Sequence, residues 1–300
     1  MMNNILFVVL FFSFILPRSV ASAEQRIIAV QGFEIKPYEE ALKGFQSVCN
    51  VETKTIVISE QEGTEITKSI RRIKPDMILA VGVDALSKVK KIKDIPIVYL
   101  MVPNPQSVIS KEENITGVSM NIHPEKQLGL LQEVLYQVKR VGLLYDPSKT
   151  GFLVEKALYS SEKLGIKLIV KEVHNPKDVP SMLDSMKDGI DAFWMLPDTT
   201  VVTPETVEYL LLFSLENKIP VLTFSDKYLD LGAMISVSID AFDIGKQAGE
   251  IANEILSGTN IKNLPRVDPR KSVLTLNLRA AKKLGITVKN KIISKARIIN

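Results

Sequence analysis

Apolar and polar positions along this chain predict strands and helices that follow one another in regular order. Short apolar runs recur about every 20 to 30 residues from residue 26 onward, and the first four are Arg26–Gln31, Lys54–Ile58, Asp76–Val81 and Pro96–Met101. Continuous apolar character with little alternation is typical of parallel strands buried on both faces. Between these runs, residues 37–48 and 63–73 carry apolar side chains at spacings of three and four, which predicts crossover helices.

A second series of the same kind begins at residue 127. A helical pattern over Gln127–Val138 precedes four more strand-like runs, Val141–Tyr145, Lys167–Val170, Ala192–Leu196 and Pro220–Phe224. Helices are expected between them at 151–164, 178–187 and 203–217, the last with Thr203 as its N-cap. The short polar segment Asn114–Ser119 separates the two series. The pattern therefore predicts an α/β protein of two doubly wound parallel-sheet lobes.

The elements that follow the second series predict a hinge made of several crossings. A long amphipathic helix is expected over Ala241–Leu256 and a further strand over Ser272–Leu276. Because the second series is already complete, we expect both to return to the first lobe. The resulting division is a signal peptide at 1–23, lobe 1 at 24–118 plus 241–290, lobe 2 at 119–240, and a C-terminal tail at 291–300.

The first residues have the features of an export signal. An apolar run, Ile5–Leu16, is followed by Pro17 and by the small residues Ala21–Ala23, so cleavage is expected near Ala23. The run is too short to span a bilayer core of about 30 Å. Since no basic residue precedes it, an uncleaved anchor and a buried N-terminal strand remain alternatives. The prediction is a periplasmic protein.

Composition and motifs argue against several classes of function. The net charge of +4 is small, so no nucleic-acid partner is expected. Cys49 is the only cysteine, which excludes an intrachain disulfide, and it is predicted to be a buried, inert thiol. The two histidines, His123 and His174, lack metal-ligand spacing, so no metal site is expected. Nucleotide-binding glycine motifs and a nucleophile elbow are also missing, so neither a cofactor nor catalytic residues are expected.

Polar residues gather at the carboxyl ends of the expected strands, where open parallel sheets bind ligands. These loops combine small hydroxyls with single carboxylates and contain no arginine, which fits a small ligand bearing an ammonium and a carboxylate group better than a phosphate. The candidate ligand-binding residues are Gly32, Phe33, Val83, Asp84, Asn104, Ser148, Thr150, Asp198, Thr199, Ser225 and Asp226.

Asp198 is the strongest of these candidates. The helix after it is expected to start only at Thr203, so its carboxylate is not needed as an N-cap, whereas capping is an equal alternative for Asp84 and Asp226. We expect Asp198 to pair with the ligand's ammonium group. The carboxylate of the ligand is expected to accept hydrogen bonds from the hydroxyls of Ser148, Thr150 and Thr199. Trp194 is assigned to the core.

Seven segments together resemble the solute-binding proteins of ABC transporters with the type 1 periplasmic-binding fold, in the group likened to the tryptophan-binding TrpX proteins. They are Pro75–Gly82, Ile95–Pro105, Asn114–Ser119, Arg140–Ser148, Ile219–Ser225, Asp243–Gly249 and Leu276–Ile286. The resemblance spans residues 26–288. It implies two lobes that close on a small ligand and deliver it to an ABC permease in the inner membrane. It also implies that the cleft is faced by Asn104, Ser148, Thr150, Asp198 and Asp226.

Two departures from that family fall in the expected pocket. Members commonly have aspartate where this chain has Asn104, and many have Asn-Ser where it has Thr150–Phe152. The resemblance therefore implies an amino-acid-like ligand without identifying it.

The sequence favours an exported, non-catalytic solute receptor of an ABC importer that acts as a monomer by hinge closure. Two other classes remain open. A periplasmic ligand-sensing module for a membrane signalling partner would have the same fold. A secreted enzyme acting on a small metabolite would need an acid–base pair, which Glu34 and Asp198 on opposite lobes could supply.

Overall fold

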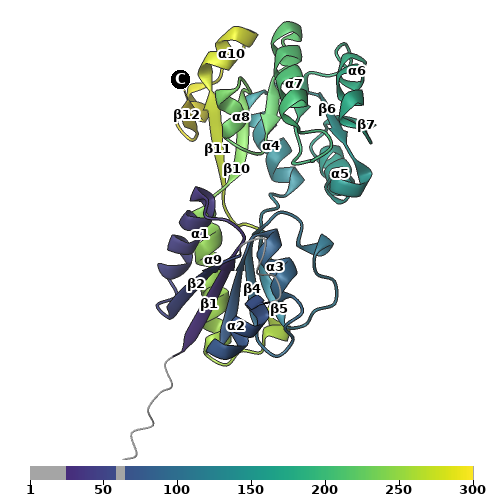
Figure 1. The fold of residues 1–300 in the computed structure, drawn as a ribbon. Coiled ribbons are helices and arrows are strands. Elements are labelled where there is room, and N and C mark those ends of the chain that lie inside the picture. Colours follow the sequence, from purple (N-terminus) through teal and green to yellow (C-terminus); the bar gives the residue numbers. More distant parts are fainter. Residues whose placement is uncertain (1–24, 59–64, 300) are drawn as a thin grey trace, which may run out of the picture.

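The chain folds into two α/β lobes, one above the other, joined at a narrow waist (Figure 1). This computed structural model describes residues 25–58 and 65–299. The expected fold class, two doubly wound lobes built on parallel sheets, is confirmed. The expected signal peptide and its cleavage point lie outside the described residues. No helix within the described ranges has the length and apolar character needed to cross a membrane.

The first sheet is parallel throughout, in the order β2-β1-β3-β4-β5. Its strands are β1 (Arg26–Gln31), β2 (Glu52–Val57), β3 (Met77–Val81), β4 (Ile97–Val102) and β5 (Ile115–Ser119). Side chains alternate between its faces: Ile27 and Ala29 pack with α1 (Lys36–Gln46) and α9 (Ala241–Leu256), whereas Ile28 and Val30 pack with α2 (Glu65–Ile73) and α3 (Val83–Val89). Cys49 is buried as predicted, and burial raises the pKa of its thiol.

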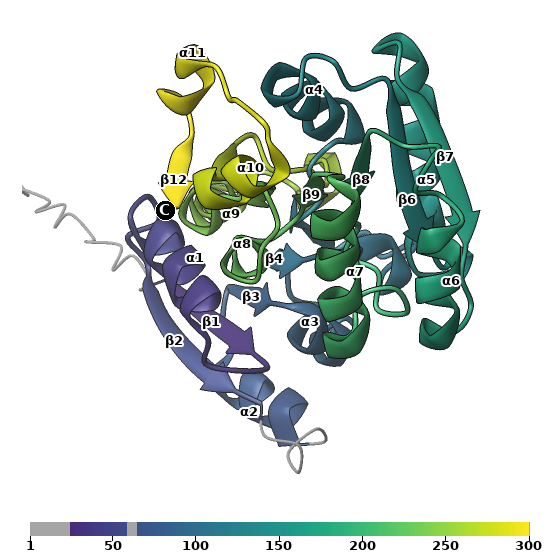
Figure 2. The same ribbon diagram turned by 90° about the horizontal axis from the view of Figure 1, so that it is seen from above.

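The second sheet has the order β12-β11-β10-β9-β8-β6-β7. Its strands are β6 (Arg140–Tyr145), β7 (Lys167–Glu172), β8 (Ala192–Trp194), β9 (Val221–Thr223), β10 (Ile235–Ile239), β11 (Ser272–Asn277) and β12 (Arg297–Ile299). Helices α4 (Pro124–Val134), α5 (Pro147–Lys163), α10 (Leu278–Leu284) and α11 (Asn290–Ile293) contribute to the core on one face. Helices α6 (Val179–Asp184), α7 (Pro204–Asn217) and α8 (Lys227–Asp230) pack on the other. Figure 2 shows α4 and α7 on opposite sides of this sheet.

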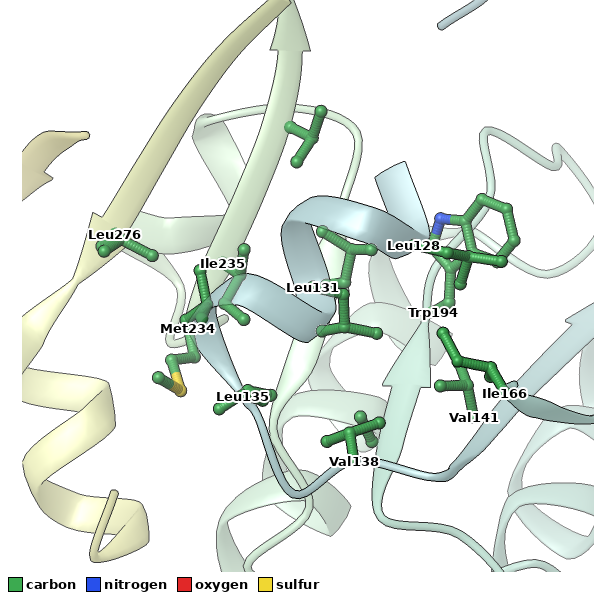
Figure 3. Close-up of a cluster of buried hydrophobic side chains, with 14 of the residues drawn as sticks. Leu128, Leu131, Leu135, Val138, Val141, Ile166, Trp194, Met234, Ile235 and Leu276 are labelled. Carbon is green, nitrogen blue, oxygen red and sulfur yellow. The ribbon is translucent and has the colours of Figure 1, made fainter. Parts of the chain in front are cut away.

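The core of the second lobe forms around α4 (Figure 3). Leu128 and Leu131 of this helix are fully buried, and they face the same cluster as Trp194. The assignment of Trp194 to the core is confirmed, since the side chain is 1% exposed. Its indole Nε1 donates a hydrogen bond to Gln127 Oε1 at 3.2 Å, which satisfies the one polar atom of the ring.

Several expected element ends are confirmed. Helix α7 begins after Thr203, whose hydroxyl accepts a hydrogen bond from the Thr206 backbone N–H, while the Thr206 hydroxyl accepts one from the Thr203 N–H. This reciprocal pair satisfies two donors that the helix leaves open. Helix α9 has the expected bounds, and Asp240 caps it by accepting from the Asp243 N–H.

Three expectations about the chain's organisation need correction. The segment Asn114–Ser119 is not a separator, because residues 115–119 form β5, a buried edge strand of the first sheet. The segment 241–290 divides between the lobes: α9 packs on the first sheet, but β11 pairs antiparallel with β10 of the second. The C-terminal residues are not a separate tail, since β12 pairs with β11. An apolar run predicts a strand but does not say which sheet it joins.

The chain crosses between the lobes three times, at residues 120–123, at Asp240 and at residues 268–271. Strands β5 and β10 both end at a crossing, so their carboxyl ends lie at the waist. Because the neighbours of these strands within β1–β5 and β6–β10 are parallel, the carboxyl edges of both sheets face the waist. The loops that carry the candidate residues therefore lie on either side of it.

Candidate ligand-binding site

The first lobe brings three of its candidate loops together. Gly32 follows β1, Asp84 lies in the first turn of α3 after β3, and Asn104 follows β4. Strands β1, β3 and β4 are adjacent, so these residues share one edge. A Cβ built on Gly32 would lie 3.1 Å from Asp84 Oδ2, which shows how closely the two loops approach.

Tyr38 of α1 joins this group, although it falls within residues 37–48, whose apolar spacing predicted only a crossover helix. A Cβ on Gly82 would lie only 2.1 Å from the Tyr38 hydroxyl, and Gly82 has φ +88°. Only glycine therefore allows the phenol to lie over the end of β3. Burial raises the pKa of Tyr38, and the nearby charge of Asp84 raises it further.

Gln31, the last residue of β1, lies at this edge as well and is not among the candidates. Its side chain is 5% exposed, and its Oε1 accepts no hydrogen bond from any described residue. Asn104 Oδ1 is likewise buried and accepts none from the described part of the chain. The remaining first-lobe candidates, Phe33 and Val83, are 60% and 38% exposed and so present apolar surface at the same edge.

The structure gives Asp198 a different role from the one expected. Its side chain is fully buried, and both oxygens are engaged. Oδ2 accepts from the Asp146 N–H at 2.8 Å and from the Thr150 hydroxyl at 2.5 Å. Oδ1 accepts from the N–H groups of Thr200 and Val201. In this conformation Asp198 ties the loop after β8 to the start of α5 and presents no surface to a ligand.

Thr150 and Ser148 are drawn into the same network. Thr150 is 3% exposed and donates to Asp198, so its hydroxyl is not presented to the waist. Ser148 is exposed, but its hydroxyl and N–H both donate to Asp146 Oδ1. The Thr200 hydroxyl donates to Asp146 Oδ2 at 2.7 Å, and these hydrogen bonds, that of Thr200 foremost, lower the pKa of Asp146.

The last candidate loop follows β9. Asp226 is half-buried and accepts hydrogen bonds from the Ser236 and Thr275 hydroxyls, which lie on β10 and β11. Ser225 beside it is half-buried too, and Thr199 is exposed. Of the second-lobe candidates, Ser148, Thr199, Ser225 and Asp226 therefore keep surface at the waist.

No hydrogen bond or ion pair joins the candidate residues of one lobe to those of the other within the described ranges. Asp84 and Asp226, the two candidate carboxylates that keep surface, also form no ion pair with any described lysine, arginine or histidine. The two halves thus carry carboxylates whose charge no described side chain neutralises by contact, which favours a ligand with a positively charged group.

Other parts of the described structure offer less. A groove of about 930 Å³ lies between α7, α8 and α10, but none of the candidate residues lines it. Residues 25–58 and 65–299 contain no group of three or more histidine, cysteine, aspartate or glutamate side chains arranged to hold a metal ion.

A family model described as ABC transporter substrate binding protein matches residues 31–299. The chain belongs to this family. Its members are substrate-binding proteins rather than enzymes. This substrate-binding protein is 25% identical over 201 residues to a tyrosine-binding protein of Clostridioides difficile, in an alignment that covers 64% of this chain and 58% of that protein. An uncharacterized protein of Rickettsia prowazekii is 25% identical over 150 residues, covering 50% and 49%. The chain spans about half the length of the curated relatives it matches.

Solved structures share the fold. The ligand-free, open structure of CD0873, a substrate binding protein with adhesive properties from Clostridium difficile, gives a TM-score of 0.78 at 21% identity and covers 92% of this chain and 99% of that one. An ABC domain from Streptococcus pneumonia in complex with L-Trp gives 0.68 at 20% identity, covering 92% and 100%. The expected type 1 periplasmic-binding fold is confirmed.

Proposed function

We propose that this protein is the solute receptor of an ABC importer, and that it binds a small amino-acid-like ligand between its lobes by closing at the waist. One observation carries the proposal: in a chain matched by the family model over residues 31–299, the carboxyl edges of both sheets face each other across three crossings. A ligand that contacts both edges favours the closed arrangement by the free energy of those added contacts.

Two features support an amino acid as the ligand. The carboxylates at the waist lack cationic partners among the described residues and so suit an ammonium group. Relatives point the same way, since one is named a tyrosine-binding protein and a solved structure of the same fold holds L-Trp.

The conformation described here corresponds to the receptor before ligand binding. No hydrogen bond or ion pair joins the candidate residues across the waist in the described ranges. The higher TM-score with the ligand-free, open structure than with the L-Trp complex is in keeping with this assignment.

The proposal includes a place of action and a partner. A receptor of this kind works outside the cytoplasmic membrane, which agrees with the export signal expected in residues 1–23. It passes its ligand to an ABC permease in that membrane and works as a monomer.

Titration calorimetry of the chain from residue 24 onward against the L-amino acids tests the proposal. We expect one-to-one binding of one amino acid or a few, without turnover, and a smaller radius of gyration by X-ray scattering in the bound state. Conversion of a ligand to product would make the protein an enzyme and contradict the receptor function. A panel in which nothing binds would rule out an amino-acid ligand.

A further inference from the structure

Two buried amide oxygens at the carboxyl edge of the first sheet have no hydrogen-bond donor among the described residues: Gln31 Oε1 and Asn104 Oδ1. Folded proteins pair nearly all buried polar atoms, because an unpaired one loses its hydration without compensation. Two such atoms of the same kind at one edge therefore call for a functional reason.

The direction of the Gln31 side chain follows from the strand. Ile27 and Ala29 precede it at two-residue spacing and pack in the cluster against which Tyr38 lies. Since every second residue of a strand points to the same face, Gln31 lies on the face of Tyr38. Its register partner is Val81, next to Gly82, over which the Tyr38 hydroxyl is placed.

Asn104 reaches the same edge from the other side of β3. It follows β4, and β1 and β4 both flank β3. Two strands that flank a third lie roughly 10 Å apart, so amide side chains from both can approach one small group between them. Asp84, at the start of α3 directly after β3, adds a carboxylate near this position.

An amide oxygen can only accept a hydrogen bond, and a carboxylate adds negative charge. We propose that Gln31 and Asn104 accept hydrogen bonds from the ammonium group of the ligand, with Asp84 as its counter-charge. The inference rests on the proposed function. It assigns binding of the ammonium group to the first lobe rather than to Asp198 of the second. The exposed hydroxyl of Thr199 is left for the other end of the ligand.

Stability of the ligand-free protein gives the first test, with a matched control. Gln31→Met keeps the length of the side chain and removes the unpaired oxygen, so the Tm should stay level or rise by up to about 4 °C. Gln127 is a similarly buried glutamine at 8% exposure, but it donates to the Ile122 carbonyl and accepts from Trp194. Gln127→Met should therefore lower the Tm by about 4–10 °C. A similar fall for Gln31→Met would mean that its oxygen is paired structurally and would overturn the inference.

Binding gives the second test. The probes are L-tyrosine, L-tryptophan and the tightest other L-amino acid of the panel, each compared with its desamino carboxylic acid. We expect Gln31→Met and Asn104→Leu each to weaken binding of the amino acids about 10- to 100-fold. Binding of the desamino acids should change by less than about threefold, since they lack the group that these oxygens receive.

The outcomes separate the two proposals. If the wild type binds an amino acid tightly and the variants bind it equally well, or lose amino and desamino acid alike, the ammonium subsite is overturned and the receptor function stands. If the wild type binds the desamino acid as tightly as the amino acid, the ammonium subsite is likewise overturned and the receptor function stands. If the wild type binds no amino acid, the proposed ligand class is overturned and the subsite with it.

Discussion

Asp198 shows how far residue patterns can indicate a binding site in this protein. The sequence correctly predicts that Asp198 lies in a loop after a strand. It also correctly predicts that Thr203, and not Asp198, caps α7. A carboxylate that caps no helix is nonetheless free for a ligand only if nothing else binds it. Here four donors do, and they come from residues about 50 positions away as well as from its own loop. Such long-range pairing is a property of the fold.

Gln31 and Tyr38 also lie at the carboxyl edge of the first sheet, but the sequence did not make them candidates. Gln31 ends a strand whose four preceding residues, 27–30, are apolar, and Tyr38 occupies an apolar position of α1, so each pattern indicated the core. A polar residue closing a buried strand was the available signal for Gln31. For Tyr38 the signal was Gly82, but a positive φ and the space above it are visible only in three dimensions.

The scaffold role of Asp198 leads to a stability prediction. Asp198→Asn replaces one carboxylate oxygen by an NH₂ group, which cannot accept the hydrogen bonds that the surrounding N–H and hydroxyl groups donate to that oxygen. We therefore expect the free energy of unfolding in urea to fall by about 2–4 kcal/mol. Asp84→Asn, at an exposed carboxylate, should change it by less than about 0.5 kcal/mol. If Asp198→Asn instead kept its stability and lost amino-acid binding, Asp198 would be a ligand contact rather than a structural residue.

Asp146 gives a pH prediction. Hydrogen bonds from Thr200 and Ser148 lower the pKa of its carboxyl below the ordinary 3.8, so the folded state holds the ionised form more strongly than the unfolded state does. The resulting stabilisation is complete above that value and is lost as the pH falls through the folded pKa. Unfolding measured between pH 6 and pH 2, values chosen to bracket about 4, should therefore show a shallower acid decline for Asp146→Asn than for wild type. A curve for Asp146→Asn that runs parallel to that of wild type over this pH range would contradict the prediction.

Among the elements, strands and helices were predicted more reliably than their partners. Runs such as Arg26–Gln31 and the helix Ala241–Leu256 have the expected bounds, because apolar spacing is a local property. The antiparallel pairing of β11 with β10 depends on which edge is unoccupied once both sheets have formed. Strand β5 was missed because Thr116, Gly117 and Ser119 make its sequence polar, although all five of its residues are buried.

Helix α9 returns to the first lobe and packs closely against α1. A Cβ on Gly245 would lie 1.9 Å from the Ala41 carbonyl oxygen, and one on Gly44 would lie 1.9 Å from that of Phe242. Backbone atoms cannot give way as flexible side chains do, so the two helices meet at a distance that only glycine permits. This contact fixes α9, which lies between the second and third crossings.

Gly245→Ala should therefore separate the two helices and lower the free energy of unfolding by about 2–4 kcal/mol. Gly129→Ala in the middle of α4 is the matched control, because a Cβ there meets nothing within 4 Å. That variant should gain about 0.5–1 kcal/mol from helix propensity. Urea unfolding of both variants checks the pair, and equal stability would show that the α1–α9 contact tolerates a side chain.

For the molecule as a whole, the three crossings do not have equal freedom. The third is bound to α9: Arg270 donates to both oxygens of Asp243 and to both of Glu250, and Lys271 forms an ion pair with Asp243 at 3.2 Å. At the start of this crossing, Asp268 accepts a hydrogen bond from the hydroxyl of Ser119, the last residue of β5, so the third crossing is also linked to the strand that leads into the first. We therefore expect the lobes to turn about a base anchored on the first lobe, with the dihedral changes in the residues beyond it.

Arg270→Met tests this anchor. Burial acts to raise the pKa of Asp243, and Arg270 and then Lys271 outweigh it, so the carboxyl has a lowered pKa and stabilises the folded state above its ordinary 3.8. Without Arg270, the Asp243 side chain, which is 4% exposed, keeps only Lys271 as an ion-pair partner. The free energy of unfolding at pH 7 should therefore fall by about 1–2 kcal/mol. This is less than for a fully buried pair, because Arg270 is itself 41% exposed. Arg71→Met, which breaks an ion pair exposed on both sides, should cost less than about 0.5 kcal/mol.

The same variant separates an anchor from a merely stabilising ion pair. If residues 268–271 are held on α9 in both the open and the closed state, amide hydrogen exchange there is slow with and without ligand in the wild type, and Arg270→Met speeds it in both states. A segment that must leave α9 for the lobes to close would instead exchange faster on ligand binding in the wild type. In that case Arg270→Met would strengthen ligand binding, because it removes contacts that only the open state makes.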